Sequence, residues 1–253
     1  MKHTKPYTIS FCSGKRSVGK SVVAANIGSL LADFGKNVLM CDADIAFPTL
    51  HLINGIEPRM RMYDILEGNV PLHTAIYQVK RNLALIAGAS GQISKIEDEQ
   101  FRKCLQGIIA LDEFESIIFD CNFGAGTDVM ECCEVSDMIV ILISDEPGSL
   151  IDGYGLIKIL QSTMPSKDIR VIVNNVIDKE DAEEAEQKLN LAMARFLSSE
   201  IYSLGFVPYD RLVKTSIIRQ ELLVKYHPNS EAALELKNIA HVIDEISKLE
   251  IFV

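Results

Sequence analysis

The sequence lacks several features that would place it at a membrane, outside the cell or on nucleic acid. It has no run of 18 apolar residues and no apolar signal segment after the short basic stretch 1–6, so we predict a cytoplasmic protein. It also lacks an excess of positive charge, since 25 Lys and Arg against 35 Asp and Glu give a formal net charge of -10. Such a chain repels nucleic acid unless it has a basic patch, and no direct nucleic-acid binding is predicted.

The cysteines show no CxxC spacing, which argues against an iron–sulfur carrier that uses such a pair in its C-terminal part. There are six: Cys12, Cys41, Cys104, Cys121, Cys132 and Cys133. Three lie in apolar runs typical of strands, and we predict reduced core residues. The adjacent Cys132 and Cys133 leave a metal site as an alternative, although chain neighbours rarely face one ion.

Apolar runs rich in β-branched residues alternate with segments of helical spacing. Predicted strands are 7–12, 37–41, 83–87, 116–120, 138–144, 169–174 and 205–207, and predicted helices are 21–34, 98–114, 150–162, 182–203 and about 230–249. This alternation is typical of an α/β fold with three layers, a doubly wound and mostly parallel sheet covered on both faces. Because no linker or repeat interrupts it, we predict a single domain over 1–253, with the last helix at its periphery.

The strongest chemical motif follows the first predicted strand. Residues 14–21, here called the phosphate loop, read Gly-Lys-Arg-Ser-Val-Gly-Lys-Ser and fit G-x-x-x-x-G-K-[ST] between a strand and a helix. Backbone N–H groups of the loop and the helix start would surround a β-phosphate, Lys20 would neutralise β- and γ-phosphate oxygens, and Ser21 would bind Mg²⁺. The predicted nucleotide-binding residues are Gly14, Lys15, Ser17, Val18, Gly19, Lys20, Ser21 and Val22. The alternative is an ordinary strand-to-helix turn.

Lys15 directly after Gly14, together with Asp42-Ala43-Asp44 after the second strand, resembles the deviant Walker A ATPases of the MinD/ParA class, which are SIMIBI-type P-loop NTPases. The resemblance implies that Lys15 reaches across an ATP-sandwiched homodimer to the partner's phosphates and is catalytic there, much as an arginine finger is. It also implies that Asp44 orients the attacking water near Mg²⁺. For Lys15 alone, a solvent-facing loop lysine is the alternative.

Further segments match this class in the same order along the chain. Residues 45–58 resemble the first switch region, and 116–124 resemble the Walker B strand and second switch, which implies that Asp120 serves the Mg²⁺ water shell. A strand-end carboxylate acting as a helix cap is the alternative for Asp120. Segments 85–91 and 144–154 resemble the flagellar-number regulators of the FlhG (FleN) subgroup. Asn174 and the run Pro208-Tyr209-Asp210 resemble adenine-contacting positions, with a turn at Asn174-Asn175 as the alternative.

The resemblance implies a Mg-ATP-dependent ATPase that forms a homodimer with ATP, hydrolyses it slowly to ADP without a partner, and acts as a spatial or numerical regulator. The protein partner would be a flagellar, division or polar-assembly factor. Two alternatives stay open: a nucleotide-binding scaffold with impaired hydrolysis, and a ParA-type ATPase that positions cell division or cargo. An Mrp-type iron–sulfur carrier ranks last.

Two departures from this class bear on the phosphate loop and on membrane association. Arg16 and Ser17 replace two glycines, which allow backbone conformations and close approaches that a side chain restricts. At the other end, Leu249 and the final residues 251–253 are apolar but carry few basic neighbours, whereas a peripheral membrane helix combines both features. Membrane association at the inner face and packing on the domain are therefore both open for this segment.

Overall fold

The computed structural model describes residues 5–89 and 97–250, and a mostly parallel sheet forms its centre. In that part of the chain the strand order is β3-β4-β2-β5-β1-β6-β7-β8. All neighbouring pairs are parallel except β3 with β4. The strands are β1 (Tyr7–Ser13), β2 (Val38–Asp42), β3 (Ile76–Lys80), β4 (Leu83–Ile86), β5 (Ser116–Phe123), β6 (Met138–Ile143), β7 (Asp168–Val176) and β8 (Tyr202–Pro208).

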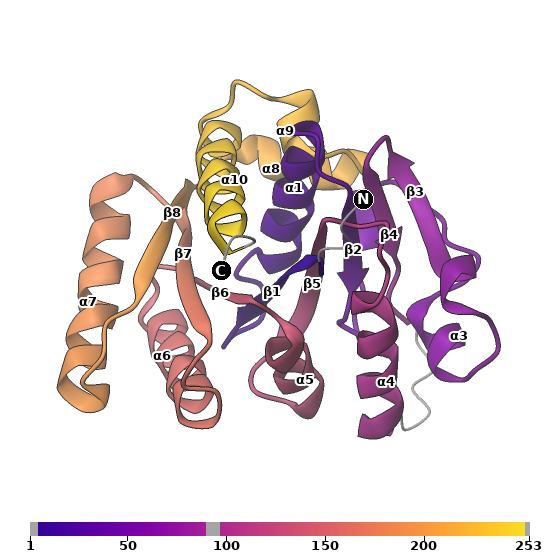
Figure 1. The fold of residues 1–253 in the computed structure, drawn as a ribbon. Coiled ribbons are helices and arrows are strands. Elements are labelled where there is room, and N and C mark those ends of the chain that lie inside the picture. Colours follow the sequence, from indigo (N-terminus) through magenta and orange to yellow (C-terminus); the bar gives the residue numbers. More distant parts are fainter. Residues whose placement is uncertain (1–4, 90–96, 251–253) are drawn as a thin grey trace.

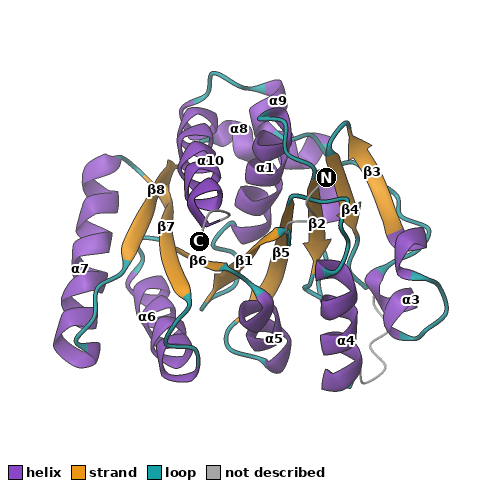
Figure 2. Cartoon of the chain, in the orientation of Figure 1, coloured by secondary structure: helices purple, strands orange, loops and turns teal. Residues whose placement is uncertain are grey.

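Helices cover both faces of this sheet (Figure 1; Figure 2). They are α1 (Lys20–Asp33), α2 (Leu50–Ile53), α3 (Met62–Leu66), α4 (Asp98–Ile109), α5 (Thr127–Val135), α6 (Pro147–Thr163), α7 (Lys179–Leu197), α8 (Arg211–Arg219), α9 (Leu223–Tyr226) and α10 (Glu231–Glu250), with the 3-10 turn η1 (Leu72–Ala75). One apolar cluster joins the sheet to α1 and α10, and a second joins its other face to α4, α5, α6 and α7. The predicted three-layer α/β fold is therefore confirmed.

The predicted strands are all present. Strands β1, β2 and β6 are continuous apolar runs buried on both sides, as parallel strands are, whereas β8 is only partly buried. The antiparallel edge strand β3 was missed. Its sequence Ile-Tyr-Gln-Val-Lys mixes polar and apolar residues, and none of its side chains is fully buried. The pattern also missed the short helices α5 and α8, of nine residues each.

The acidic segment at 178–187 starts a helix, but the predicted helix boundaries of 182–203 were wrong at both ends. Helix α7 begins at Lys179, because the side chain of Asp178 accepts a hydrogen bond of 3.0 Å from the Asp181 N–H and caps it. It ends at Leu197, where Ser198 takes the left-handed conformation, and β8 starts at Tyr202. The predicted helix 98–114 likewise ends early, at Ile109.

The C-terminal helix α10, expected at the periphery, belongs to the core and packs against α1 and β8. Its buried Asp244 forms ion pairs with Lys36, at 3.1 Å, and with Lys248, at 2.7 Å. Burial alone would raise the pKa of Asp244, but its contacts with Lys248 and Lys36 outweigh burial and hold that pKa below its ordinary value. Of the predicted C-terminal segment, Leu249 is exposed and 251–253 lie outside the described residues. Across 5–89 and 97–250 no helix has the length and apolarity that a membrane span needs.

Candidate nucleotide-binding site

The phosphate loop leaves the carboxyl end of β1 and enters α1 through backbone positions that suit glycine. Gly19 has φ +86° and precedes the first helical residue, Lys20. At Gly14 a side chain has no room, since an added Cβ would lie 2.2 Å from the backbone oxygen of Asp152 on α6. Of the two replaced glycines only Ser17 takes the left-handed conformation, with φ +63°, and Arg16 does not. Arg16 therefore needs no glycine-like conformation, whereas Ser17 adopts one that favours glycine.

Lys20 is nearly buried and lies 2.7 Å from a carboxylate oxygen of Asp120, which is fully buried within β5. Burial alone would lower the pKa of Lys20, but the charge and hydrogen bond of Asp120 outweigh it and raise that pKa above its ordinary value. Lys20 therefore stays protonated and points a full positive charge into the loop. This is the charge that phosphate oxygens require.

Two further carboxylates surround this lysine. Asp42 pairs in register with Asp120 across β2 and β5, and one of its oxygens accepts hydrogen bonds from the Thr49 and Leu50 N–H groups at 2.8 and 2.9 Å. Burial, followed by the charge of Asp120, raises the pKa of Asp42 well above its ordinary value. Asp44 accepts a hydrogen bond of 2.9 Å from the Phe47 N–H, and burial raises its pKa too.

The site has spare buried oxygens that suit a hard cation. The second oxygens of Asp42 and Asp120 are buried and have no hydrogen-bond partner. Within the described residues 5–89 and 97–250, no three His, Cys, Asp or Glu side chains converge to hold a metal by themselves. Mg²⁺ does not need such a cage, because it is commonly held by one or two carboxylates together with substrate phosphates and water. The residues present therefore fit Mg²⁺ that arrives with a phosphate ligand.

Two adjoining cavities flank the phosphate loop, and both are lined by Ser17, Val18, Gly19, Val22 and Ile217. The first, of about 430 Å³, also contacts Lys20, Ser21 and Asp44. The second, of about 350 Å³, also contacts Asn174, Pro208 and Asp210. One cavity thus offers charge and metal ligands, and the other has the mixed apolar and amide lining that suits a base.

The structure brings together most of the predicted residues, but it gives some of them other partners. Asn174 donates a hydrogen bond of 2.7 Å to the Val18 carbonyl and so supports the loop, while Asp210 accepts from the Leu212 N–H and caps α8. Gly14 and Asp120 line neither cavity. Gly14 leaves room for the backbone oxygen of Asp152, and Asp120 contacts Lys20.

Lys15 lies outside both cavity linings and pairs with Glu146 at the start of α6, at 2.5 Å. Both side chains are substantially exposed. The predicted role of Lys15 in a partner subunit therefore requires that it leave Glu146. The pair could not be anticipated from spacing, since 131 positions separate its members.

Three residues that line the first cavity were not predicted as site residues: Arg16, Phe47 and Phe123. The guanidinium of Arg16 lies 4.7 Å from the ring centroid of Phe47 and 4.3 Å from that of Phe123. The sequence did mark Arg16 as a departure from glycine, but its two aromatic partners are far apart in the sequence, since Phe47 follows β2 and Phe123 ends β5. Asp42, quoted only as part of the Asp-x-Asp run, was also given no role.

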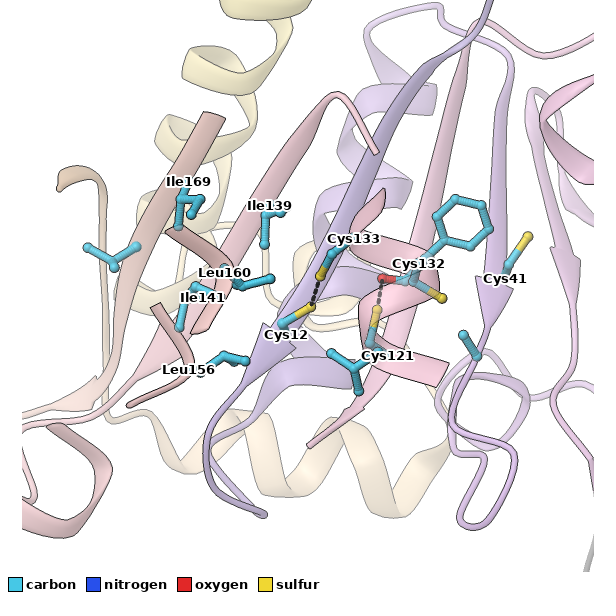
Figure 3. Close-up of a cluster of buried hydrophobic side chains, with 14 of the residues drawn as sticks. Cys12, Cys41, Cys121, Cys132, Cys133, Ile139, Ile141, Leu156, Leu160 and Ile169 are labelled. Atoms are coloured by element: carbon cyan, nitrogen blue, oxygen red, sulfur yellow. Dashed lines mark hydrogen bonds between the residues drawn. The ribbon is translucent and has the colours of Figure 1, made fainter. Parts of the chain in front are cut away.

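The cysteines lie behind the site in the core, and all six are buried and free. Figure 3 shows Cys133 on α5 directed at Cys12 on β1, with 3.5 Å between their sulfur atoms. Cys132 points in another direction from the same helix (Figure 3). The prediction of reduced core residues is confirmed, and the alternative of a metal site at the adjacent pair finds no support among the residues that the structure describes.

Comparison with known proteins agrees with this geometry. The model of the CobQ/CobB/MinD/ParA nucleotide binding domain matches residues 9–224. The chain belongs to this family. The match includes the phosphate loop and every strand of the described sheet except the first two residues of β1, so the family covers the fold as well as the site.

Two bacterial proteins are similar in sequence to this chain over most of its length. The antiactivator FleN of Pseudomonas aeruginosa is 27% identical over 93% of this chain and 85% of its own length. The flagellum site-determining protein YlxH of Helicobacter pylori is 29% identical over 96% of this chain and 82% of its own. The predicted resemblance to the flagellar subgroup is confirmed at this level of identity.

Solved structures of MinD share the fold. The septum site-determining protein MinD of Pyrococcus horikoshii, complexed with Mg-ADP, superimposes with a TM-score of 0.84 at 23% identity, over 96% of this chain and 98% of that one. MinD of Aquifex aeolicus, in a MinC:MinD complex, gives 0.80 at 27% identity, over 94% and 96%. The eight-stranded sheet is thus a MinD-like fold.

Proposed function

We propose that this protein is a Mg²⁺-dependent ATPase that acts as a molecular switch, forming a homodimer with ATP and returning to the monomer after hydrolysis. The observation that carries the proposal is the pair of adjoining cavities around the phosphate loop, one with Lys20, Ser21 and Asp44 and the other with Asn174. A nucleoside triphosphate needs both kinds of lining: charged groups and metal ligands for its phosphates, and a mixed apolar and amide surface for its base.

Each polar residue then has a chemical role. Lys20 neutralises the β- and γ-phosphate oxygens, which compete with Asp120 for its charge. Ser21 would bind Mg²⁺ through its hydroxyl, and Asp120 and Asp44 would hold it through its water ligands. The metal would supply charge stabilisation when bound. Asp44 also orients the attacking water. Loop and helix N–H groups from Gly14 to Val22 surround the phosphates, and Asn174, Pro208 and Asp210 border the base.

The dimer depends on Lys15. Its present partner Glu146 is exposed and the ion pair is a surface contact, which contributes at most about 1 kcal/mol. A partner subunit's phosphates, with several negative charges, would compete well against one carboxylate. We therefore propose that Lys15 exchanges Glu146 for the partner's nucleotide when the dimer forms, and stabilises transition-state charge there.

The cellular role proposed is control of the number or placement of flagella, through a protein partner that binds the ATP-bound dimer. The names of the relatives FleN and YlxH support this choice. The MinC:MinD complex of a structural relative supports regulation through a protein partner. Division or cargo positioning is the alternative role on the same chemistry, and we place the protein in the cytoplasm with transient association at the inner membrane face.

The test combines binding with turnover. Wild type is expected to bind Mg-ATP by calorimetry and to release phosphate slowly, whereas Asp44→Ala should retain binding and lose phosphate release. Glu180→Gln on the exposed start of α7 serves as the control for loss of one carboxylate. If Asp44→Ala releases phosphate at the wild-type rate, Asp44 has no role in hydrolysis.

One observation favours a second candidate function, a nucleotide-holding scaffold. Lys15 is held by Glu146, and Arg16 is stacked between aromatic rings, so neither is aimed at a partner's phosphates in this state. A scaffold would bind Mg-ATP with no turnover, even when its protein partner is added. Measurable phosphate release by wild type excludes it.

A further inference from the structure

Arg16 joins three segments at the carboxyl ends of three neighbouring strands. It lies in the phosphate loop after β1, Phe47 lies in the segment after β2, and Phe123 ends β5. Ring centroids lie 4.7 and 4.3 Å from the guanidinium carbon, distances at which a cation is attracted to an aromatic face. One side chain therefore connects three segments of the site.

The stack leaves the hydrogen-bonding edge of the guanidinium unused. In the described part of the chain Arg16 donates no side-chain hydrogen bond and forms no ion pair, although it carries five N–H donors. Its guanidinium carbon lies over both rings, and Arg16 lines the same cavity as Lys20 and Ser21. A planar cation with free edge donors beside a phosphate site matches the geometry of phosphate oxygens.

The two aromatic partners are coupled to the carboxylates that the mechanism uses. The Phe47 N–H donates to Asp44, at 2.9 Å. Phe123 lies three residues after Asp120, and the Gly124 N–H donates to the Ser13 carbonyl at 2.8 Å, which fixes the end of β5 beside β1. A movement of the Arg16 guanidinium would therefore displace the segments that carry both Asp44 and Asp120.

We propose that Arg16 is a phosphate-sensing residue that acts within its own subunit. Its guanidinium donates to the terminal phosphate of a bound nucleoside triphosphate, and the stack with Phe47 and Phe123 transmits that contact to both segments. A diphosphate lacks the oxygens that Arg16 reaches, so this residue makes the site favour triphosphate. The inference rests on the proposed nucleotide binding and assigns a role to the residue that replaces a glycine of the family.

The first experiment compares affinities for Mg-ATPγS and Mg-ADP by calorimetry. Arg16→Gln is expected to weaken Mg-ATPγS binding by about tenfold to a hundredfold, the range for loss of charged hydrogen bonds, and to change Mg-ADP binding by less than about twofold. Arg16→Lys should recover only part of the loss, because an ammonium lacks the planar fork. The control is Arg195→Gln, since Arg195 also stacks on an aromatic ring, Phe196, but on the exposed face of α7.

The second experiment tests transmission through the stack. The chain has no tryptophan, so Phe47→Trp and Phe123→Trp each introduce a single fluorescent reporter. Emission from either reporter is expected to change with Mg-ATPγS and not with Mg-ADP, and Arg16→Gln should remove this difference. Thermal unfolding of each variant checks that the fold is retained.

The outcomes separate this inference from the proposed function. If wild type binds neither nucleotide, both are overturned. If wild type binds but Arg16→Gln weakens both nucleotides equally, or neither, only the sensing role is overturned. A selectivity loss that appears only at protein concentrations where dimers form would overturn the assignment to the same subunit, since a residue acting in its own subunit needs no partner.

Discussion

Replacing Lys20 with methionine should destabilise the nucleotide-free protein as well as abolish nucleotide binding. The side chain has a similar length, so the change removes the charge with little loss of packing. It leaves Asp120 fully buried without its cation and in register with the buried Asp42. Removing one member of a buried ion pair costs about 3 to 5 kcal/mol.

Protonation gives a second route to the magnitude. In Lys20→Met the repulsion between Asp120 and Asp42 is relieved most cheaply when one of the two carboxyls is protonated. At pH 7 this protonation costs about 4 kcal/mol for a group with an ordinary pKa of about 3.9. The two values agree. For a chain of this size about 4 kcal/mol lowers the melting temperature by about 8 to 16 °C.

The assay is thermal and urea unfolding followed by circular dichroism at 222 nm, without nucleotide. Lys15→Met is the matched control, because its ion pair with Glu146 is exposed and its loss should cost under about 1 kcal/mol. Adding Asp120→Asn to Lys20→Met should restore most of the stability but no nucleotide binding. The reasoning is refuted if Lys20→Met is no less stable than Lys15→Met, or if the double variant recovers nothing.

The remaining predictions concern the metal, the loop glycine and pH. Chelation of Mg²⁺ with EDTA should abolish phosphate release, and activity that persists in EDTA would exclude the metal from the reaction. Gly14→Ala should cost about 1 to 3 kcal/mol in urea unfolding, because its Cβ would meet the Asp152 carbonyl, whereas Gly148→Ala in α6 has open space and should not be destabilising; equal effects would contradict this. Folding lowers the pKa of Asp244. The ionised Asp244 therefore stabilises the folded protein above its ordinary pKa of 3.8, and this stabilisation is lost as the pH falls through the pKa that Asp244 has in the folded protein. Asp244→Asn should therefore cost about 2 kcal/mol at pH 7 and progressively less below pH 4, and a cost independent of pH would argue against the ion pairs.

The layers of the fold could be predicted because parallel strands are buried on both sides and read as continuous apolar runs. This is true of β6, whose six residues Met138–Ile143 are all buried. It is not true of β3, which lies at the edge and keeps polar residues. Helix α5 was missed because it is short and follows a glycine-rich turn at 124–126. Local pattern thus identifies buried elements better than edge or short ones.

The site could be predicted where one motif holds several functional residues in sequence. Lys20 and Ser21 follow Gly19 directly, and the strand-to-helix context fixes their direction. The remaining contacts join distant parts of the chain, as in the stack of Arg16 on Phe123 or the hydrogen bond from Asn174 to Val18. Periodicity carries no information about such pairs, because they depend on which strand ends become neighbours in the sheet.

The central claim is that nucleotide state controls assembly, and solution mass tests it most directly. Light scattering should be measured with Mg-ATP, using Asp44→Ala to prevent hydrolysis, and separately with Mg-ADP. The account predicts a mass near 28.1 kDa with Mg-ADP and a doubling with Mg-ATP. Adding Lys15→Ala should reduce this doubling. An unchanged monomer with both nucleotides would contradict the switch and leave a nucleotide-binding protein that acts without dimerising.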